Sequence, residues 1–219
     1  SMITVDEAHC ISQWGQDFRP SYLNIVDMVA GLPTRPVVSA FTATATKEVQ
    51  EDMQCVLQLR DPKVLVTGFD RANLYFEVRN GGSKDARLLE YIKEHRGESG
   101  IIYCATRKNV EAVYTALRMA DIPVTRYHAG LSAEERKENQ DQFIFDERPV
   151  MVATNAFGMG IDKSNVRYVV HYNMPQSMEN YYQEAGRAGR DGERAECVLL
   201  YSPQDVRINQ MPVSYTHLR

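Results

Sequence analysis

Residues 100–104 read Gly-Ile-Ile-Tyr-Cys, an unbroken run without a charged side chain that ends just before the polar residues Thr106 and Arg107. A short run of this kind is typical of a strand buried on both faces, as in a parallel sheet. The segment that follows spaces apolar residues at i, i+3, i+4 and i+7 from Val110 to Leu117, which predicts a helix with one buried face. A strand followed directly by an amphipathic helix is the repeating unit of an α/β fold.

The same alternation continues on both sides of this unit. Further strands are predicted at residues 74–78, 124–127, 149–153, 168–172 and 197–201, and a helix at residues 84–95. Ser132 and Glu135 have the spacing of a capping box and open another predicted helix. This part of the chain is therefore predicted to be an α/β domain whose parallel sheet is covered by helices on both faces.

The first part of the chain has fewer elements. We expect strands at residues 3–5 and 36–41 and helices at residues 21–32 and 47–57, the last of them capped by Thr46. A further apolar run covers residues 64–67, and we place the domain boundary after it. The expected domains are residues 1–71 and 72–205, and residues 206–219 are expected to form a poorly ordered tail.

Composition narrows the class of protein. The chain has 219 residues, of which 43% are hydrophobic, and a formal net charge of −4. A surface that binds nucleic acid must therefore be local, because there is no overall basic charge. The four cysteines lie far apart without Cys-x-x-Cys spacing, which predicts free thiols, a reducing cytoplasmic setting and no zinc site. No apolar run approaches the length that crosses a membrane, and the N-terminus lacks a signal-peptide layout.

Two adjacent carboxylates, Asp6 and Glu7, follow the first predicted strand and precede His9. An acidic pair at a strand end can hold Mg²⁺, usually through water, and leave one carboxylate free to orient a nucleophilic water. A solvated turn after a strand would carry the same residues.

Residues 183–192, Gln-Glu-Ala-Gly-Arg-Ala-Gly-Arg-Asp-Gly, place Arg187 and Arg190 three positions apart. If the segment is helical, both guanidinium groups lie on one face and can bind an anion such as phosphate. The alternative is a helix C-terminus that glycines loosen and arginines complement electrostatically. An acidic pair and an arginine pair together are the two halves of a nucleoside-triphosphate site.

Polar residues follow the strands of the second domain, namely Thr106, Arg107, His128 and Thr154. Ligands of parallel sheets bind beyond the carboxyl ends of the strands, so we expect these residues and the arginine helix to share one surface. Hydroxyl and guanidinium groups there can bind a DNA backbone without reading its sequence. An N-cap or a surface charge is the alternative for each, and His128 is equally suited to a structural role.

Trp14, Phe18 and Arg19 belong to an aromatic loop after the acidic pair and could stack on unpaired bases. The alternative is that both aromatic rings fill a core beneath the loop.

The segment Gly-Met-Gly-Ile-Asp at residues 158–162 combines glycines, which allow close approach to a phosphate or sugar, with Asp162, which can accept from a ribose hydroxyl or order the arginines. The alternative is a tight turn that needs positive φ.

Four segments, in order along the chain, resemble motifs II, III, V and VI of RecQ-type DNA helicases. They read Asp-Glu-Ala-His-Cys-Ile-Ser-Gln-Trp-Gly at residues 6–15, Ser-Ala-Phe-Thr-Ala-Thr-Ala-Thr at 39–46, Ala-Thr-Asn-Ala-Phe-Gly-Met-Gly-Ile-Asp-Lys at 153–163, and the arginine segment at 183–192. The resemblance runs from residue 2 to about residue 210. Four motifs in order are far more specific than any one of them.

The resemblance implies two RecA-like lobes, the first truncated at its N-terminus, from a bacterial cytoplasmic, nucleoid-associated enzyme that uses ATP and Mg²⁺. This enzyme would move 3′ to 5′ and unwind DNA in replication, recombination and repair, without contact to a membrane. Asp6 would hold Mg²⁺ through water, Glu7 would orient the attacking water, and His9 would relay the state of the site. The residues implied to contact single-stranded or duplex-junction DNA are Trp14, Phe18, Arg19, Thr106, Arg107, His128 and Thr154.

The arginine segment is implied to act on the nucleotide. Arg190 would be the main arginine finger and Arg187 would support it, an effect worth about 10³–10⁵ in rate in other phosphoryl-transfer systems. Gln183, Gly160 and Asp162 are implied to contact the nucleotide as well.

Two alternatives remain open. The sequence contains no Gly-Lys pair, so it lacks the phosphate-binding loop of such motors, and the chain could be an inactive fragment or a non-catalytic module that binds single-stranded nucleic acid. An RNA helicase of the related Asp-Glu-Ala-Asp group is disfavoured by His9 and by the Trp14 loop.

Overall fold

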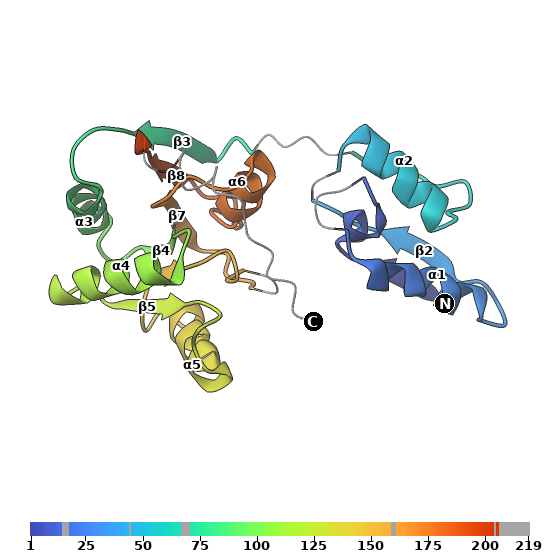
Figure 1. Ribbon diagram of the computed structural model, residues 1–219, viewed down its shortest axis with the longest axis horizontal. Helices are drawn as coiled ribbons and strands as arrows, with labels where there is room; N and C mark the ends of the chain where they lie inside the picture. Colours follow the sequence, from blue (N-terminus) through green and yellow to red (C-terminus); the bar gives the residue numbers. More distant parts are fainter. Residues whose placement is uncertain (15–17, 44, 67–70, 159–160, 204, 206–219) are drawn as a thin grey trace, which may run out of the picture. The chain divides into compact units, whose positions relative to one another are not determined.

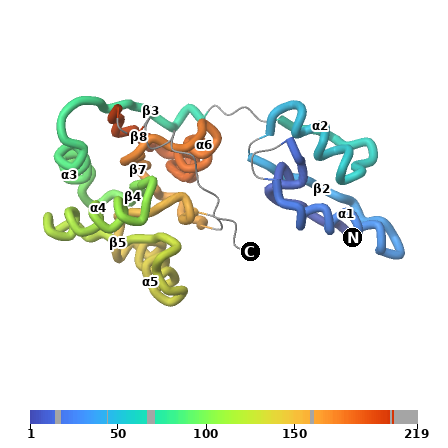
Figure 2. Tube along the Cα trace, in the orientation of Figure 1, coloured from blue at the N-terminus to red at the C-terminus, as the bar shows by residue number. Residues whose placement is uncertain are grey.

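The computed structural model of the chain describes residues 1–14, 18–43, 45–66, 71–158, 161–203 and 205 (Figure 1). The chain divides into two compact units, residues 1–69 and 70–219. The predicted tail, residues 206–219, lies outside the described residues. Figure 2 traces the order of the elements along the chain.

Unit 1 contains a two-stranded parallel sheet of β1 (Met2–Val5) and β2 (Val37–Ala40). Two short 3₁₀ helices, η1 (Ala8–Ile11) and η2 (Pro20–Leu23), and two α-helices, α1 (Asn24–Ala30) and α2 (Lys47–Val56), accompany it. The core forms where η1 and α2 meet the sheet, with the buried side chains Val5, Ala8, Ile11, Val49, Met53 and Leu57.

Unit 2 is built on a six-stranded sheet in the order β3-β8-β7-β4-β6-β5, and every neighbouring pair is parallel. The strands are β3 (Leu74–Arg79), β4 (Ser99–Tyr103), β5 (Val124–Tyr127), β6 (Val150–Ala153), β7 (Val166–His171) and β8 (Ala195–Leu200). The helices are α3 (Lys84–Glu94), α4 (Arg107–Met119), α5 (Ala133–Ile144) and α6 (Met178–Ala185). The predicted α/β class with a parallel sheet is thus confirmed.

Successive residues of the central strands point to opposite faces of this sheet and enter different cores. Ile102, Val152 and Val170 pack on the face that α3 and α4 cover, and the preceding residues Ile101, Met151 and Val169 pack on the face of α5 and α6. This explains why the central strands are apolar throughout. Gly100 of β4 is required for the same packing, because a Cβ there would overlap the buried Tyr168 ring.

Side chains in front of five helices act as N-caps. Thr46, Ser83, Thr106, Ser132 and Ser177 each accept a hydrogen bond from a backbone N–H in the first turn that follows. The Ser132 cap is the predicted capping box, since Glu135 returns a bond to the backbone of Ser132. Such a cap contributes about 1 kcal/mol to a helix.

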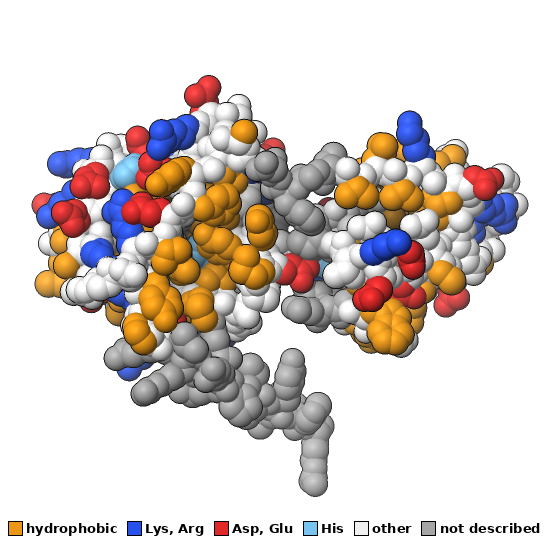
Figure 3. Space-filling model, turned by 90° about the horizontal axis from the view of Figure 1, so that it is seen from above, with side chains coloured by type: hydrophobic (Ala, Val, Ile, Leu, Met, Phe, Trp, Pro, Cys, Tyr) orange, Lys and Arg blue, Asp and Glu red, His pale blue; other side chains and the backbone are white. Residues whose placement is uncertain are grey.

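Three local predictions differ from the structure. The apolar residues 64–66 form no strand, and the predicted helix at residues 21–32 is a 3₁₀ turn followed by the shorter α1. The helix before the arginine pair ends at Ala185. Strand β3 lies at one edge of the sheet with exposed Tyr75, Phe76 and Val78. Figure 3 shows a face of unit 2 on which hydrophobic side chains gather.

Candidate functional site

The acidic turn of unit 1 is strained and incompletely paired. Glu7 follows β1 with φ 47° and ψ 42°, a left-handed conformation that is uncommon for a residue other than glycine and is found at functional sites. The Asp6 carboxylate accepts a hydrogen bond of 2.9 Å from the Glu7 backbone N–H. The Oε2 atom of Glu7 is shielded from solvent and has no hydrogen-bond partner among the described residues. A shielded carboxylate oxygen without a hydrogen bond costs free energy, so this atom can accept one from water or a ligand.

His9 connects the acidic turn to the segment after β2. Its Nδ1 atom lies 2.8 Å from the Thr42 hydroxyl and 3.4 Å from Glu7 Oε2. The backbone holds the same two segments together, because the Ala8 N–H donates to the Phe41 carbonyl over 2.9 Å. The acidic turn and the Thr42 segment are therefore joined by a side-chain contact and by a backbone hydrogen bond.

The loop after η1 presents an aromatic ring to solvent. Trp14 is 78% exposed, so it does not fill a core, and its backbone N–H donates to the Ser12 hydroxyl. Phe18 is half-buried and Arg19 is exposed. The Arg19 backbone N–H donates to the Cys10 carbonyl over 2.8 Å, which fixes the end of the loop against η1. The ring of Trp14 is thus accessible for stacking.

Three predicted residues follow neighbouring strands of the unit 2 sheet. They lie at the end of the sheet where the strands terminate, which we call its carboxyl edge. Thr106 and Arg107 come after β4, and Thr154 follows β6, which pairs with β4. The Thr106 hydroxyl accepts from the Asn109 N–H over 3.1 Å and so caps α4, while Arg107 is exposed. Thr154 is half-buried, and its backbone N–H donates to the Tyr127 carbonyl.

His128 follows β5 at the same edge but is buried. Its Nε2 lies 2.7 Å from a Glu111 carboxylate oxygen, and its Nδ1 accepts from the Gly130 N–H over 3.1 Å. Both ring nitrogens are therefore used within the protein. This geometry favours the structural role that the sequence left open for His128.

The backbone of the arginine turn, residues 186–192, lies at the opposite end of the sheet, where the strands begin. We call this end the amino edge. The Gly189 N–H donates to the carbonyl of Val166, the first residue of β7, and the Asp191 N–H donates to the Ser164 carbonyl. Helix α6 starts beyond the carboxyl end of β7 and brings the chain back, so its end reaches the amino edge. The backbone of the turn is thus held at the amino edge, whereas the Arg187 guanidinium reaches toward the side chain of Tyr103, the last residue of β4, so the shared surface with Thr106 and Thr154 stays a prediction.

Arg71 and Asn73, just before β3, hold the arginine turn in place. The Arg71 guanidinium donates to the carbonyls of Gly186 and Gly189 over 2.9 and 2.5 Å. The Asn73 amide donates to the carbonyls of Gly189 and Glu193, each over 2.8 Å. Neither residue was predicted from the sequence. Their only signal is an Arg-x-Asn spacing directly before a predicted strand, which does not indicate a partner more than a hundred positions away.

The two arginines of the turn have different environments. Arg187 is partly buried and donates to the Gly158 carbonyl, and its Nε atom has no partner among the described residues. Arg190 donates to the Ile161 carbonyl over 3.0 Å, and its side chain remains 39% exposed, 3.9 Å from the carboxylate of the exposed Asp162. Arg187 is thus committed to the protein, whereas Arg190 is accessible to a ligand.

Both arginines bind the crossover segment, residues 154–158 and 161–165, which joins β6 to β7. This segment starts at the carboxyl edge with Thr154 and ends at the amino edge, so it connects the two edges without a helix. The Tyr103 hydroxyl donates to the Phe157 carbonyl over 3.1 Å. Burial raises the pKa of the Tyr103 phenol, and the nearby Arg187 charge offsets only part of that effect. Gln183 lies half-buried on α6, and Gly160 lies outside the described residues.

A buried His171–Glu184 pair connects β7 to α6. This pair was not predicted from the sequence either. His171 Nε2 lies 2.9 Å from a Glu184 carboxylate oxygen, and the ring packs against Tyr103 and Tyr181 with centroid distances of 5.7 and 4.8 Å. A histidine inside an apolar strand pattern was its only signal. The pair fixes the helix whose end carries the arginine turn.

Groups of three or more His, Cys, Asp or Glu side chains that could hold a metal directly do not occur in the part of the chain that the structure describes. Within the same residues, no helix is long and apolar enough to cross a membrane. The four cysteines are free thiols, and Cys55 is the exposed one.

Comparison with known proteins adds a family and a fold. Residues 83–192 match the family model described as the helicase conserved C-terminal domain. This match covers α3 to the end of the arginine turn.

The chain is 52% identical over 209 residues to the ATP-dependent DNA helicase RecQ of Bacillus subtilis, covering 95% of this chain and 35% of that protein. It is 45% identical over 205 residues to the RecQ helicase of Pasteurella multocida, covering 94% of this chain and 32% of that protein. The chain thus spans about a third of the length of these curated relatives.

Among solved structures, S. cerevisiae Dbp5 bound to RNA and ADP BeF3 matches with a TM-score of 0.72 and 24% identity. The match covers 94% of this chain and 55% of Dbp5. Identity at this level shows the fold alone, which is the α/β fold of a RecA-like helicase lobe.

Proposed function

The chain belongs to the RecQ-type helicases, whose conserved C-terminal domain it carries, and on this premise we propose that it is part of an ATP-dependent DNA helicase that moves 3′ to 5′. The observation that carries the proposal is the state of Glu7, a left-handed residue whose shielded Oε2 atom forms no hydrogen bond with the described residues and lies 3.4 Å from His9 Nδ1. Backbone strain together with a shielded carboxylate oxygen that lacks a hydrogen bond is typical of a catalytic position.

In this proposal, unit 1 belongs to the ATP-binding lobe and unit 2 forms the helicase C-terminal lobe, with the boundary after residue 69 rather than after residue 71 because Arg71 bonds to the arginine turn. Asp6 would hold Mg²⁺ through water, and the oxygen chemistry of the Asp6–Glu7 pair fits that cation. When bound, Mg²⁺ neutralises charge on the phosphates. Glu7 orients the attacking water and accepts its proton, and His9 passes the state of the pair to Thr42 through their 2.8 Å contact.

Arg190 would stabilise the charge that develops on the transferred phosphate. Its exposure and its hydrogen bond to Ile161 support this role, because a donor that is already held in place loses little entropy on binding. Arg187 positions the crossover segment by its bond to Gly158. Gln183, Gly160 and Asp162 are proposed as further nucleotide contacts.

The DNA would meet residues of both units. We assign base stacking to Trp14 and Phe18 because the Trp14 ring is accessible, and backbone contacts to the remaining predicted residues, which are Arg19, Thr106, Arg107 and Thr154. His128 would hold the backbone at this edge in place through its contacts with Glu111 and Gly130. The proposed substrate is a junction of single-stranded and duplex DNA, in replication, recombination or repair at the bacterial nucleoid.

A second candidate is a non-catalytic module that binds single-stranded nucleic acid. It is favoured by the exposed Trp14 ring, because stacking of an unpaired base on an aromatic ring needs no ATP. Such a module would bind weakly and lose affinity with added salt.

The two candidates separate in an assay of DNA-stimulated ATP hydrolysis. The 219-residue chain is compared with a longer form that includes the residues preceding it in the complete protein. Hydrolysis in the longer form alone, abolished by Arg190→Ala, supports the helicase and an inactive fragment. Absence of DNA stimulation in either form, with single-strand binding retained, supports the binding module.

A further inference from the structure

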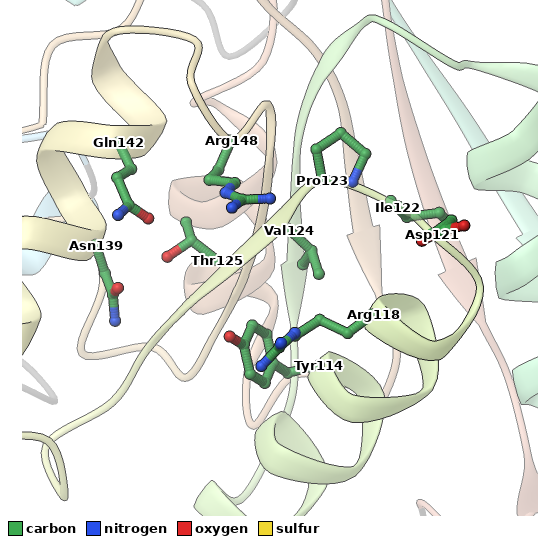
Figure 4. A pocket seen from close by; sticks show the side chains of 10 residues that line it. All are labelled: Tyr114, Arg118, Asp121, Ile122, Pro123, Val124, Thr125, Asn139, Gln142 and Arg148. Atoms are coloured by element: carbon green, nitrogen blue, oxygen red, sulfur yellow. The ribbon is translucent and has the colours of Figure 1, made fainter.

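A pocket of about 510 Å³ lies at the amino edge of the unit 2 sheet, beside the edge strand β5 (Figure 4). Its walls come from the end of α4, the loop that follows it, the start of β5, the second half of α5 and Arg148 before β6. None of the residues assigned above to ATP or DNA lines it. A volume in this range is ordinary for a small-molecule site.

Two arginines line this pocket and have no acidic partner among the described residues. Arg118 comes from the last turn of α4 and Arg148 from the loop before β6, so they approach from different elements (Figure 4). The Arg118 guanidinium lies over the Tyr114 ring, 5.6 Å from its centroid. The neighbouring Arg126 is instead paired with Glu111 over 3.0 Å, so it does not compete for a ligand in the pocket.

Between the arginines, the hydroxyl of Thr125 faces the pocket and points toward Asn139 and Gln142 (Figure 4). Thr125 as a whole is 3% exposed, but its hydroxyl is not among the side-chain atoms that are shielded from solvent without a partner, so it is open to water or to a ligand in the pocket. This position, inside β5, is fixed by the sheet.

The negative charge near the pocket is limited. Asp121 lies at its rim, where it is exposed to solvent and screened. The C-terminal ends of α4 and α5 also face this edge and add partial negative charge. Part of the positive charge of the arginines is needed to compensate for it. Two guanidinium groups still exceed one exposed carboxylate.

The geometry points to a second anion site, distinct from the nucleotide site, that binds a small phosphorylated compound up to about mononucleotide size. Arg118 and Arg148 donate to phosphate oxygens with their planar forks, and Thr125 donates its hydroxyl. A phosphate carries about −1.5 to −2 charges at neutral pH and offers three acceptor oxygens, which matches two guanidinium groups and one hydroxyl better than a carboxylate does.

The test is a titration of the 219-residue chain with pyrophosphate and, separately, with inorganic phosphate, followed by NMR signals of the arginine Nε–H groups. We expect the Arg118 and Arg148 signals to shift saturably. Arg148→Gln and Thr125→Val should each weaken the affinity read from the remaining signals, the former by about tenfold or more. Arg96→Gln removes an exposed arginine outside the pocket and should leave the affinity unchanged.

Three results would overturn the proposal. The first is that the Arg118 and Arg148 signals do not move with either anion. The second is that Arg148→Gln and Thr125→Val bind as tightly as the unchanged chain, because the pocket would then not be the site. The third is that a short single-stranded oligonucleotide shifts the same signals at lower concentration than pyrophosphate, since the ligand would then be the DNA backbone.

Discussion

Replacement of Gly158 by alanine tests how Arg187 holds the crossover segment. Gly158 has φ +141°, a conformation that other residues rarely adopt, and a Cβ there would overlap the Arg187 guanidinium. The backbone strain costs about 1–3 kcal/mol. The displaced guanidinium loses its hydrogen bond to the Gly158 carbonyl, which costs a further 1.5–3 kcal/mol or so because the donor is charged.

Gly97→Ala is the matched control for this variant. Gly97 has φ +90° with no atom within 4 Å of an added Cβ, so it incurs the backbone strain without the overlap. The difference between the two variants, about 1.5–3 kcal/mol, then isolates the Arg187 contact. With a urea m-value of about 2 kcal/mol/M, it corresponds to a midpoint lower by about 0.75–1.5 M.

Urea unfolding of unit 2 is best followed by circular dichroism in the tyrosine region, because Trp14, the single tryptophan, lies in unit 1. ATP hydrolysis of the complete protein should fall together with stability in Gly158→Ala and remain near normal in Gly97→Ala. Equal midpoints for the two variants would refute the reasoning, since Arg187 would then not brace the segment.

Three further predictions concern single side chains. Burial alone would raise the pKa of Asp146, but hydrogen bonds, foremost from Lys163, hold it below the ordinary value. The free energy of unfolding should therefore fall as pH falls through the lowered pKa. In urea unfolding at a series of pH values, Asp146→Asn should make this loss at acid pH smaller. Asp146→Asn should also lower the free energy of unfolding by about 1–2 kcal/mol at pH 7, because it leaves the buried Lys163 ammonium without its ion pair. The loss is no larger because solvent screens the half-exposed Asp146 carboxylate, and unchanged stability would contradict this prediction. Cys55 alone should react rapidly with a thiol reagent in the native chain, and fast labelling of a second cysteine would show that the fold is looser. Arg190→Ala should abolish ATP hydrolysis and lower the unfolding midpoint less than Arg187→Ala does, because the Arg190 side chain is 39% exposed and its hydrogen bond to Ile161 competes with water.

The parallel sheet of unit 2 was predictable because its signals are local. Every position of residues 100–104 is apolar, and the structure shows why: Ile101 and Ile102 enter different cores on the two faces. The capping box of Ser132 and Glu135 was likewise readable from spacing alone. By contrast, the apolar run at residues 64–66 has the composition of a strand but pairs with no described strand.

The arrangement of the candidate site depends on contacts that are remote in sequence. Motif spacing placed Arg187 and Arg190 near each other but could not show that α6 carries the backbone of their turn back to the start of β7. The bonds from Arg71 and Asn73 to this turn join positions more than a hundred residues apart, and no periodicity encodes them. The exposure of Trp14 is also a tertiary property.

The most direct test of the central claim is strand separation by the complete protein that contains this chain, on duplex DNA with a single-stranded 3′ tail. The account predicts unwinding that requires ATP and Mg²⁺, prefers the 3′ tail to a 5′ tail, and is lost in a folded Arg190→Ala variant. Unwinding by Arg190→Ala at the unchanged rate, or activity on RNA duplexes alone, would contradict it.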